Sequence, residues 1–174
     1  MHFHTTSFRG IGPVTTQELR ERFERAVRDI TAYRVRDYDI TSFSTEIPVT
    51  NLMQMGTTED LFCRIGLTDL TGKQKDLADL QETMRGPALQ SALAIHTDMG
   101  SGRSPKRTSF RVVSQAESAP WRSYRRRKME EAVATGIQDR FRNWRHAEDD
   151  ANLEFWVQQA EKKALISLRL STAR

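Results

Sequence analysis

Two hydrophobic periods alternate along this chain, and their order limits its possible folds more than any other feature of the sequence. Apolar residues at every second position predict strands, whereas apolar residues three or four positions apart predict helices. The two patterns follow one another from the N-terminus to the C-terminus, so we expect a mixed α/β (α+β) fold. At 174 residues the chain is long enough for one domain or for two small ones.

The first seventy residues predict the order β-α-β-β-(α)-β. An alternating strand over residues 2–9 ends at Gly10-Ile-Gly-Pro13, a turn signal that opens a helix. Thr15 and Glu18 have the form of a capping box, and the apolar stripe from Leu19 to Ile30 predicts a helix that continues through it. The remaining elements are two strands over residues 31–36 and 39–47, a short helix around Leu52, and a strand through Leu61, Cys63, Ile65 and Leu67.

Residues 71–174 predict the order α-α-β-α-β-β. Gly86-Pro87 interrupts a helical pattern between Lys73 and Met99, so we expect two consecutive helices there. A linker-like stretch, Gly100–Pro105, separates these helices from a strand around Phe110. The remaining elements are a long helix over residues 123–144 and a hairpin of two strands, 153–157 and 164–170.

The long helix carries an apolar stripe that we expect to pack in the core. Because the aromatic members of the stripe belong to that packing face, we do not interpret them as base-stacking groups. The stripe consists of Met129, Ala132, Val133, Gly136, Ile137, Phe141 and Trp144.

Positive charge is concentrated directly in front of this helix, in the segment Trp121-Arg-Ser-Tyr-Arg-Arg-Arg-Lys128. From Lys106 to Arg145 there are eleven Lys or Arg and four Asp or Glu, a net charge of +7 in a chain whose total is +4. A helix N-terminus already carries partial positive charge, so cations there destabilise the helix unless an anion is bound. Backbone amides and arginine forks together suit phosphate, and we interpret the segment as an RNA or DNA backbone site. A solvated basic loop that pairs with acidic side chains elsewhere is the simpler alternative.

The cations in and around this segment are the candidate binding residues. They are expected to hold duplex RNA through phosphate and 2′-hydroxyl contacts, so that the shape of the RNA, more than its sequence, decides binding. The predicted contacts are Lys106, Arg107, Arg122, Arg125, Arg126, Arg127 and Lys128, with Arg140, Arg142 and Arg145 extending the patch.

No catalytic, cofactor-binding or metal-binding residue is predicted in this chain. The acidic pairs Glu130–Glu131 and Asp149–Asp150 are adjacent in sequence, so their carboxylates are expected to diverge. The single cysteine, Cys63, favours a reduced, cytoplasmic setting, and no stretch approaches the ~20 apolar residues that cross a membrane. A protein-interaction module is a further alternative, with Phe43, Met53, Met55 and Trp156 as an exposed patch.

The order of elements and several segments resemble the THUMP-domain RNA methyltransferase family. In the second half these segments are the strand Thr108–Val113, the basic stretch that leads into the helix carrying Met129 to Ile137, and the hairpin ending at Ser167–Leu170. In the first half, Gly10–Gly12 and Thr57–Phe62 resemble the turn and a later segment of the ferredoxin-like domain that precedes THUMP in that family. The resemblance implies a ferredoxin-like subdomain over residues 1–70 and a THUMP domain over residues 71–174.

In that family the two domains form an RNA-binding unit that grips tRNA or structured rRNA and delivers a base to a separate catalytic domain. The motifs that bind S-adenosylmethionine and the target amine in that catalytic domain do not occur in this sequence. The resemblance therefore implies the N-terminal, RNA-binding part of a longer methyltransferase, or a standalone binding module. The implied chemistry is S-adenosylmethionine-dependent methylation of a guanine N2 in tRNA or rRNA, with a 4-thiouridine synthetase-type enzyme as the alternative.

Overall fold

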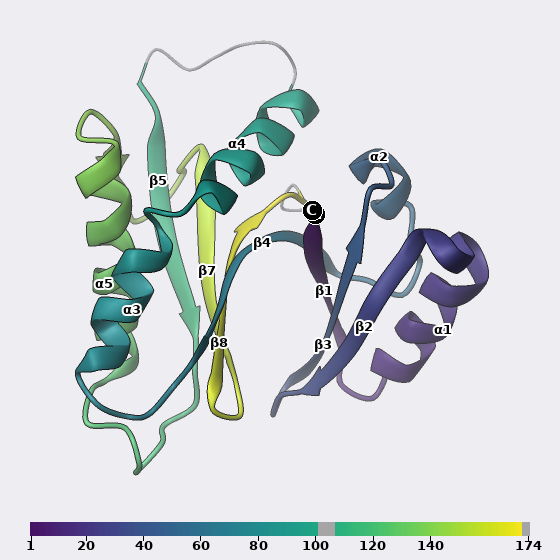
Figure 1. Ribbon diagram of the computed structural model, residues 1–174, viewed down its shortest axis with the longest axis horizontal. Coiled ribbons are helices and arrows are strands. Elements are labelled where there is room, and N and C mark those ends of the chain that lie inside the picture. The colour runs from purple at the N-terminus through teal and green to yellow at the C-terminus, as the bar shows by residue number, and fades with distance from the viewer. Residues whose placement is uncertain (101–106, 172–174) are drawn as a thin grey trace. The chain divides into compact units, whose positions relative to one another are not determined.

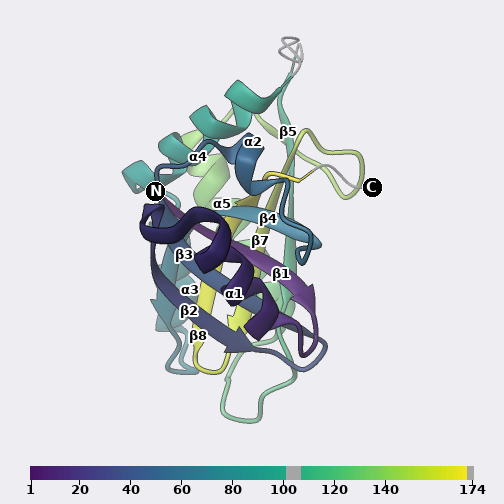
Figure 2. The same cartoon turned by 90° about the vertical axis from the view of Figure 1, so that its right-hand side faces the viewer.

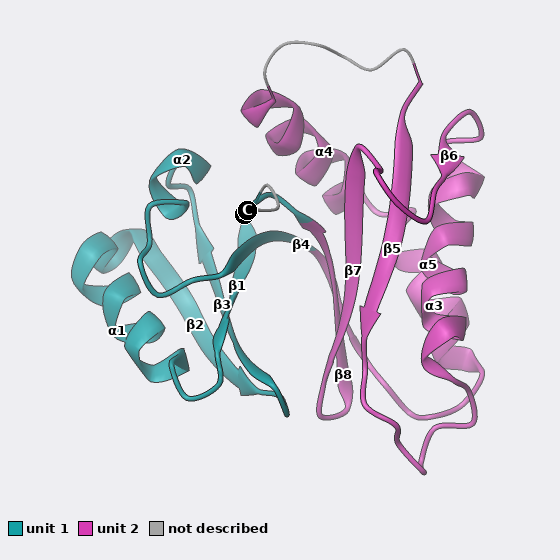
Figure 3. Ribbon diagram, turned by 180° about the vertical axis from the view of Figure 1, so that it is seen from behind, with its two compact units in different colours: residues 1–64, 169–174 teal, residues 65–168 magenta. Residues whose placement is uncertain are grey.

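A computed structural model of the chain describes residues 1–100 and 107–171 and shows a mixed α/β protein, which confirms the expected fold class (Figure 1). The chain divides into two compact units (Figure 3). Unit 1 takes in Met1–Arg64 and the chain from Arg169 onward, and unit 2 takes in Ile65–Leu168. The boundary at residue 70 between a ferredoxin-like and a THUMP domain stays a prediction.

Unit 1 is an antiparallel sheet with a helix on one face. Its strand order is β2-β3-β1-β4, and α1 packs against β1, β2 and β3 (Figure 2). The largest buried side chains of this unit include Phe3, Leu19, Ile40, Phe43 and Phe62. The elements are β1 (His2–Phe8), α1 (Gly12–Phe23), β2 (Val27–Arg34), β3 (Tyr38–Thr45), α2 (Val49–Leu52) and the first part of β4 (Asp60–Asp69).

The turn that leads into α1 is stabilised by a side chain from β3. The Asp39 carboxylate accepts hydrogen bonds from the backbone N–H groups of Gly10 and Gly12, at 2.8 and 2.9 Å. The turn predicted at Gly10–Pro13 is therefore confirmed, but the predicted capping box is wrong. Thr15 lies inside the helix, and Glu18 accepts hydrogen bonds from the backbone and hydroxyl groups of Thr57.

The apolar stripe predicted to run from Leu19 to Ile30 does not form one helix. The helix ends at Phe23, a single 3-10 turn covers Glu24–Ala26, and β2 begins at Val27. Glu24 adopts a positive φ of 46°, which turns the chain out of the helix. The backbone from Val27 onward then pairs with β3, and this contact distant in sequence overrides the helical spacing of the apolar residues.

The last residues of the described chain close unit 1. The backbone N–H of Leu170 donates to the carbonyl oxygen of Leu61 at 2.8 Å, and the Arg169 guanidinium pairs with the Asp60 carboxylate at 2.7 Å. Residues more than a hundred positions apart therefore lie beside one another within this unit.

Unit 2 is a mixed sheet with helices packed against it. Its strand order is β4-β8-β7-β5-β6, in which β7 and β8 form an antiparallel hairpin and β5 runs parallel to β7. The helices predicted on either side of Gly86-Pro87 are confirmed, as is the closing hairpin. The elements are the end of β4, α3 (Lys75–Thr83), α4 (Pro87–Met99), β5 (Ser109–Gln115), α5 (Arg126–Arg140), β6 (Arg145–His146), β7 (Leu153–Ala160) and β8 (Lys163–Arg169).

The long helix α5 packs closely on α3 but is shorter than predicted. It covers Arg126–Arg140 instead of residues 123–144, because Ser123 and Tyr124 are hydrogen-bonded to the turn before α3 and to its first residues, and Phe141 leaves the helical conformation. Met129, Val133 and Ile137 of the predicted stripe are fully buried. The two aromatic members are not core residues: Phe141 and Trp144 are half-buried and stack on each other with ring centroids 4.0 Å apart.

Candidate nucleic-acid interface

The basic segment, residues 121–128, is held in place by the turn that joins β4 to α3. The backbone N–H and the hydroxyl of Ser123 both donate to the carbonyl oxygen of Gly72, at 2.7 and 2.8 Å. Gly72 has a φ of +82°, and a Cβ atom at that position would collide with the carbonyl oxygen of Trp121. Only glycine therefore allows this close approach of the two backbone segments.

A buried carboxylate fixes the centre of the segment. The Tyr124 hydroxyl donates to Asp76 at 2.6 Å, and the same carboxylate accepts from the backbone N–H groups of Thr71 and Gly72 and from the Thr71 hydroxyl. Burial raises the pKa of Asp76, but these hydrogen bonds lower it by a larger amount. The pKa of Asp76 therefore lies below the ordinary value. Burial and the hydrogen bond to Asp76 raise the pKa of Tyr124 well above its usual range. At neutral pH the pair is therefore a carboxylate that accepts from a neutral phenol.

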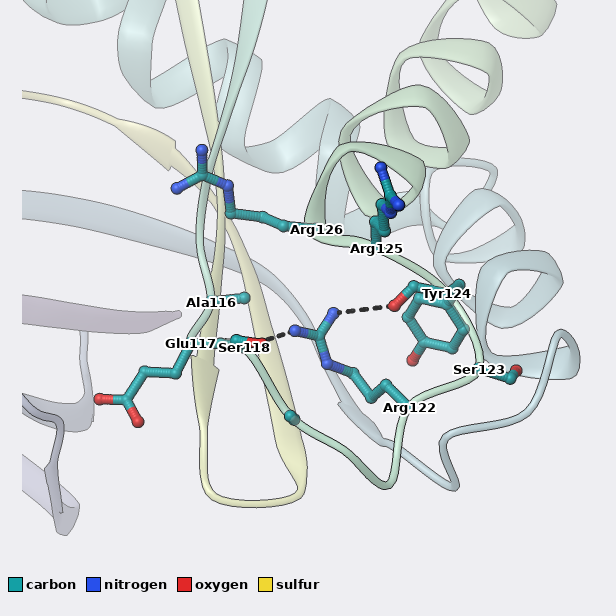
Figure 4. Close-up of a pocket in the computed structure, with 9 residues that line it drawn as sticks. Ala116, Glu117, Ser118, Arg122, Ser123, Tyr124, Arg125 and Arg126 are labelled. Atoms are coloured by element: carbon teal, nitrogen blue, oxygen red, sulfur yellow. Dashed lines mark hydrogen bonds between the residues drawn. The ribbon is translucent and has the colours of Figure 1, made fainter.

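A hollow of about 500 Å³ lies between the loop after β5 and the basic segment (Figure 4). Arg122 crosses this hollow: its guanidinium lies over the Tyr124 ring and donates to the carbonyl oxygens of Glu117 and Tyr124. Arg122, a predicted phosphate contact, therefore already donates its hydrogen bonds to backbone carbonyl groups of the protein. The hollow is lined by Ala116, Glu117, Ser118, Ala119, Arg122, Ser123, Tyr124, Arg125 and Arg126.

Arg125 and Arg126 stand at the rim of the hollow, where α5 begins. Both are exposed, and within residues 1–100 and 107–171 neither forms an ion pair. Arg125 is the N-cap residue of α5, no side chain among the described residues caps this helix end, and the first turn of α5 holds no acidic residue. The positive end of the helix and two free guanidinium groups therefore lie together at the surface.

The next two cations share one acidic partner. Arg127 and Lys128 both pair with Glu131, at 3.5 and 2.6 Å, and the hydrogen bond from Lys128 lowers the pKa of the Glu131 carboxyl. All three side chains are largely exposed, so these pairs contribute little to stability and leave both cations accessible to an anion.

The remaining predicted contacts do not join this cluster. Arg140 lies at the opposite end of α5, about 20 Å away along the helix axis. Its guanidinium donates to the carbonyl oxygens of Met84, Arg85 and Gly86, and so caps the C-terminal end of α3. Beyond this end of α5, Arg107, Arg142 and Arg145 are exposed, whereas Lys106 lies outside the described residues.

The residues that hold the basic segment in place were missed by sequence reasoning. Gly72 and Asp76 lie about fifty positions before it, and Tyr124 lies in a run that the sequence distinguishes only by its charge. A glycine in a turn, followed by an acidic residue in the first turn of a helix, is a local signal for a turn and a helix start. That local signal does not predict that Gly72 and Asp76 contact Ser123 and Tyr124 of the basic segment.

The described part of the chain gives little support to the other functions considered from the sequence, which are catalysis, metal binding and an exposed apolar patch. Glu130 accepts from Ser114 of β5 while Glu131 pairs with Lys128, so these carboxylates point apart. No cluster of three or more metal-ligating side chains occurs among the described residues, and burial raises the pKa of the Cys63 thiol to about 12. Phe43 and Met55 are buried, which excludes the proposed exposed apolar patch. No helix in the ranges described has the length and apolar character that crossing a membrane requires.

Solved structures share this fold, although no model of a protein family matches the sequence and no curated protein matches it significantly. TrmN from Thermus thermophilus matches with a TM-score of 0.71 and 13% identity, over 98% of this chain and 46% of that one. A 4-thiouridine synthetase–RNA complex with bound ATP gives 0.60 and 11%, over 97% and 41% of the two chains. SMU.472, a putative methyltransferase complexed with SAH, gives 0.56 and 10%, over 97% and 41%.

These similarities define the class of fold to which the chain belongs. Nearly the whole chain, both units included, is matched in each of the three structures, while it spans less than half the length of each of those proteins. At this level of identity the likeness establishes the architecture alone.

Proposed function

We propose that this chain is the ferredoxin-like and THUMP portion of an RNA-modifying enzyme, and that its own role is to bind structured RNA. One observation carries the proposal: Arg125 and Arg126 are exposed, without an ion pair in the described residues, at an uncapped helix N-terminus beside a hollow. An arrangement of like charges that destabilises the free helix becomes favourable when a phosphate occupies it.

The geometry favours phosphate over other anions because arginine offers planar, paired donors and the helix end adds backbone donors. Arg127 and Lys128 join this cluster by exchanging Glu131 for phosphate oxygens. Arg107, Arg142 and Arg145 form the extension that a longer RNA reaches, and Lys106 and Arg140 are proposed as further contacts. Contacts to the backbone select the shape of a folded RNA, because the major groove of A-form RNA admits side chains poorly.

The catalytic step is assigned to a domain outside this chain. Our first choice is methylation of a guanine N2 in tRNA or rRNA with S-adenosylmethionine, and the structural likeness to a putative methyltransferase complexed with SAH supports it. The second is formation of 4-thiouridine, which the likeness to a 4-thiouridine synthetase–RNA complex supports. In both, this chain holds the RNA and the other domain acts on the base, in a cytoplasmic setting.

The test is a fluorescence-anisotropy titration with a folded tRNA transcript, an rRNA hairpin and duplex DNA of matched length. We expect the wild-type chain to prefer the folded RNAs, and Arg125→Glu/Arg126→Glu to bind them at least ~100-fold more weakly, since two attractive charges become repulsive. The same double change should raise the free energy of unfolding slightly, by about 0.5 kcal/mol, because acidic residues suit a helix N-terminus.

The matched control is Arg20→Glu/Arg25→Glu, which makes an equal change of net charge on exposed residues of unit 1. We expect this control to weaken binding by only a few-fold, through the long-range field. Equal losses in the two double variants, or no loss in either, would show that the start of α5 is not the RNA site.

A further inference from the structure

The basic segment consists of a first part that is hydrogen-bonded to the rest of the fold and a second part whose side chains are exposed. Ser123 and Tyr124 are hydrogen-bonded to the turn between β4 and α3 and to the first turn of α3, while Arg125 and Arg126, the next two residues, have no ion pair in the described part of the chain. Because Tyr124 is held by hydrogen bonds, the backbone of Arg125, the next residue, begins at a defined position.

The first part of the basic segment makes more hydrogen bonds to the rest of the fold than a surface loop usually does. Asp76 is completely buried and accepts four separate donors, of which the Tyr124 hydroxyl is the only one supplied by the basic segment. The Gly72 carbonyl accepts two further hydrogen bonds from Ser123. Tyr124 itself is only 6% exposed, so its ring and hydroxyl are not available to RNA.

Resting on the proposed function, we propose that Tyr124 and Asp76 are positioning residues for RNA binding: their hydrogen bond orients Arg125, Arg126 and the start of α5 before RNA arrives. Neither side chain touches the RNA. They raise the affinity because this part of the protein is already ordered, so that less free energy of binding is lost in ordering it.

The expected magnitude follows from the side chains concerned. When the backbone of two arginines is no longer held, ordering both long side chains on binding corresponds to about a tenfold loss of affinity. Tyr124→Phe removes only the hydroxyl that Asp76 accepts, and the ring that packs under Arg122 remains.

The experiment is a double-mutant cycle on RNA affinity at a temperature where every variant is fully folded. Tyr124→Phe is combined with Arg125→Ala/Arg126→Ala, and the folded tRNA transcript is the probe. We expect Tyr124→Phe to raise the Kd about tenfold in the wild-type background and less than about twofold when both arginines are absent. Equal factors in the two backgrounds would overturn the proposal.

Two controls separate positioning from stability. Val133→Ala removes methyl groups from the buried face of α5, and Tyr33→Phe removes a phenol hydroxyl in unit 1. We expect Val133→Ala to lower the free energy of unfolding without changing the Kd, and Tyr33→Phe to change neither. A loss of affinity in Val133→Ala as large as that in Tyr124→Phe would assign Tyr124 a merely structural role.

Hydrogen exchange gives a readout that does not need RNA. The Ser123 amide donates to Gly72, and we expect it to exchange at least ~10-fold faster in Tyr124→Phe and at the wild-type rate in Val133→Ala. Unchanged protection of Ser123 in Tyr124→Phe would show that this hydrogen bond does not hold the segment. Failure of the wild-type chain to bind RNA would instead count against the proposed function, whatever the exchange at Ser123 shows.

Discussion

Asp76 is a buried carboxylate whose hydrogen-bond partners are all neutral N–H and O–H groups. These donors hold the pKa of Asp76 below the ordinary value of 3.8, despite a burial effect that raises it. The unfolded chain therefore binds a proton more readily than the folded chain does. The stabilisation is present above a pH of about 3.8 and is lost as the pH falls through the lower, folded-state pKa.

We therefore predict that Asp76→Asn lowers the free energy of unfolding at pH 7 by about 2 kcal/mol, because an amide cannot accept from all four donors. The difference from wild type should shrink as the pH falls below about 3.8, because the unfolded wild-type chain then binds a proton at Asp76 before the folded chain does. Urea unfolding followed by circular dichroism between pH 7 and pH 3 measures it. As a control, Asp79→Asn at a half-buried position loses a pair with the exposed Lys75 and should cost less than ~0.5 kcal/mol. A pH-independent difference for Asp76→Asn would contradict the account.

Single residues were predictable from sequence where their partners are local. The turn at Gly10–Gly12 was recognised because glycine in such a pattern signals a turn by itself. Glu18 was assigned to a capping box three residues away, whereas it binds a loop 39 positions later. Asp76 and Tyr124 escaped notice for the same reason, because their meaning depends on a contact 48 positions apart.

At the scale of whole elements, the contact between α3 and α5 depends on one glycine. A Cβ atom at Gly136 would lie 2.5 Å from the carbonyl oxygen of Gln81 and 2.9 Å from the Met84 side chain. Glycine in the middle of a helix costs up to about 1 kcal/mol relative to alanine. The close packing of the two helices offsets that cost.

We predict that Gly136→Ala destabilises the protein by about 1–3 kcal/mol, the opposite of its effect on an isolated helix. Thermal unfolding compared with Thr135→Ala, an exposed neighbour on the same helix, provides the measurement and its control. We expect Thr135→Ala to be neutral or slightly stabilising. A higher melting temperature for Gly136→Ala would mean that α3 and α5 are not packed as described.

Element type was predicted better than element ends. Val27 and Ile30 continue the spacing of α1 by coincidence, and only pairing with β3 makes them part of a strand. The predicted start of α5 is three residues early because Ser123 and Tyr124 fit a helical pattern until their hydrogen bonds to Gly72 and Asp76 are known. Both errors come from contacts distant in sequence that override a local pattern.

At the scale of the whole molecule, the candidate cations form two groups at opposite ends of α5. Four of them, Arg125 to Lys128, stand at its start, and Arg107, Arg142 and Arg145 stand beyond its end. Net charge and spacing in the sequence predicted a basic region, but the separation of its members along a helix axis appeared only in the fold. The order of the elements, by contrast, follows from the sequence almost completely, because each has its own hydrophobic period.

The number of phosphates contacted can be measured as a salt dependence. Four contacts predict that log affinity falls by at least about 3 for each tenfold rise in salt, since each phosphate contributes roughly 0.7 to 0.9. Arg142→Ala/Arg145→Ala should make this slope shallower by about 1 to 2 if one RNA reaches both ends of α5. An unaltered slope in that variant would confine the site to the start of the helix, and a wild-type slope near zero would exclude phosphate contacts altogether.

Unit 1 is completed by residues from the far end of the chain. While the protein is being synthesised, Leu61 and Asp60 leave the ribosome long before the residues that pair with them, Leu170 and Arg169. At a synthesis rate of about 5–20 residues per second, the edge of β4 stays unpaired for roughly 5 to 20 seconds. Unit 1 therefore completes its sheet only after unit 2 has been synthesised, and in that interval the unpaired edge of β4 is open to pairing with other chains unless a chaperone covers it.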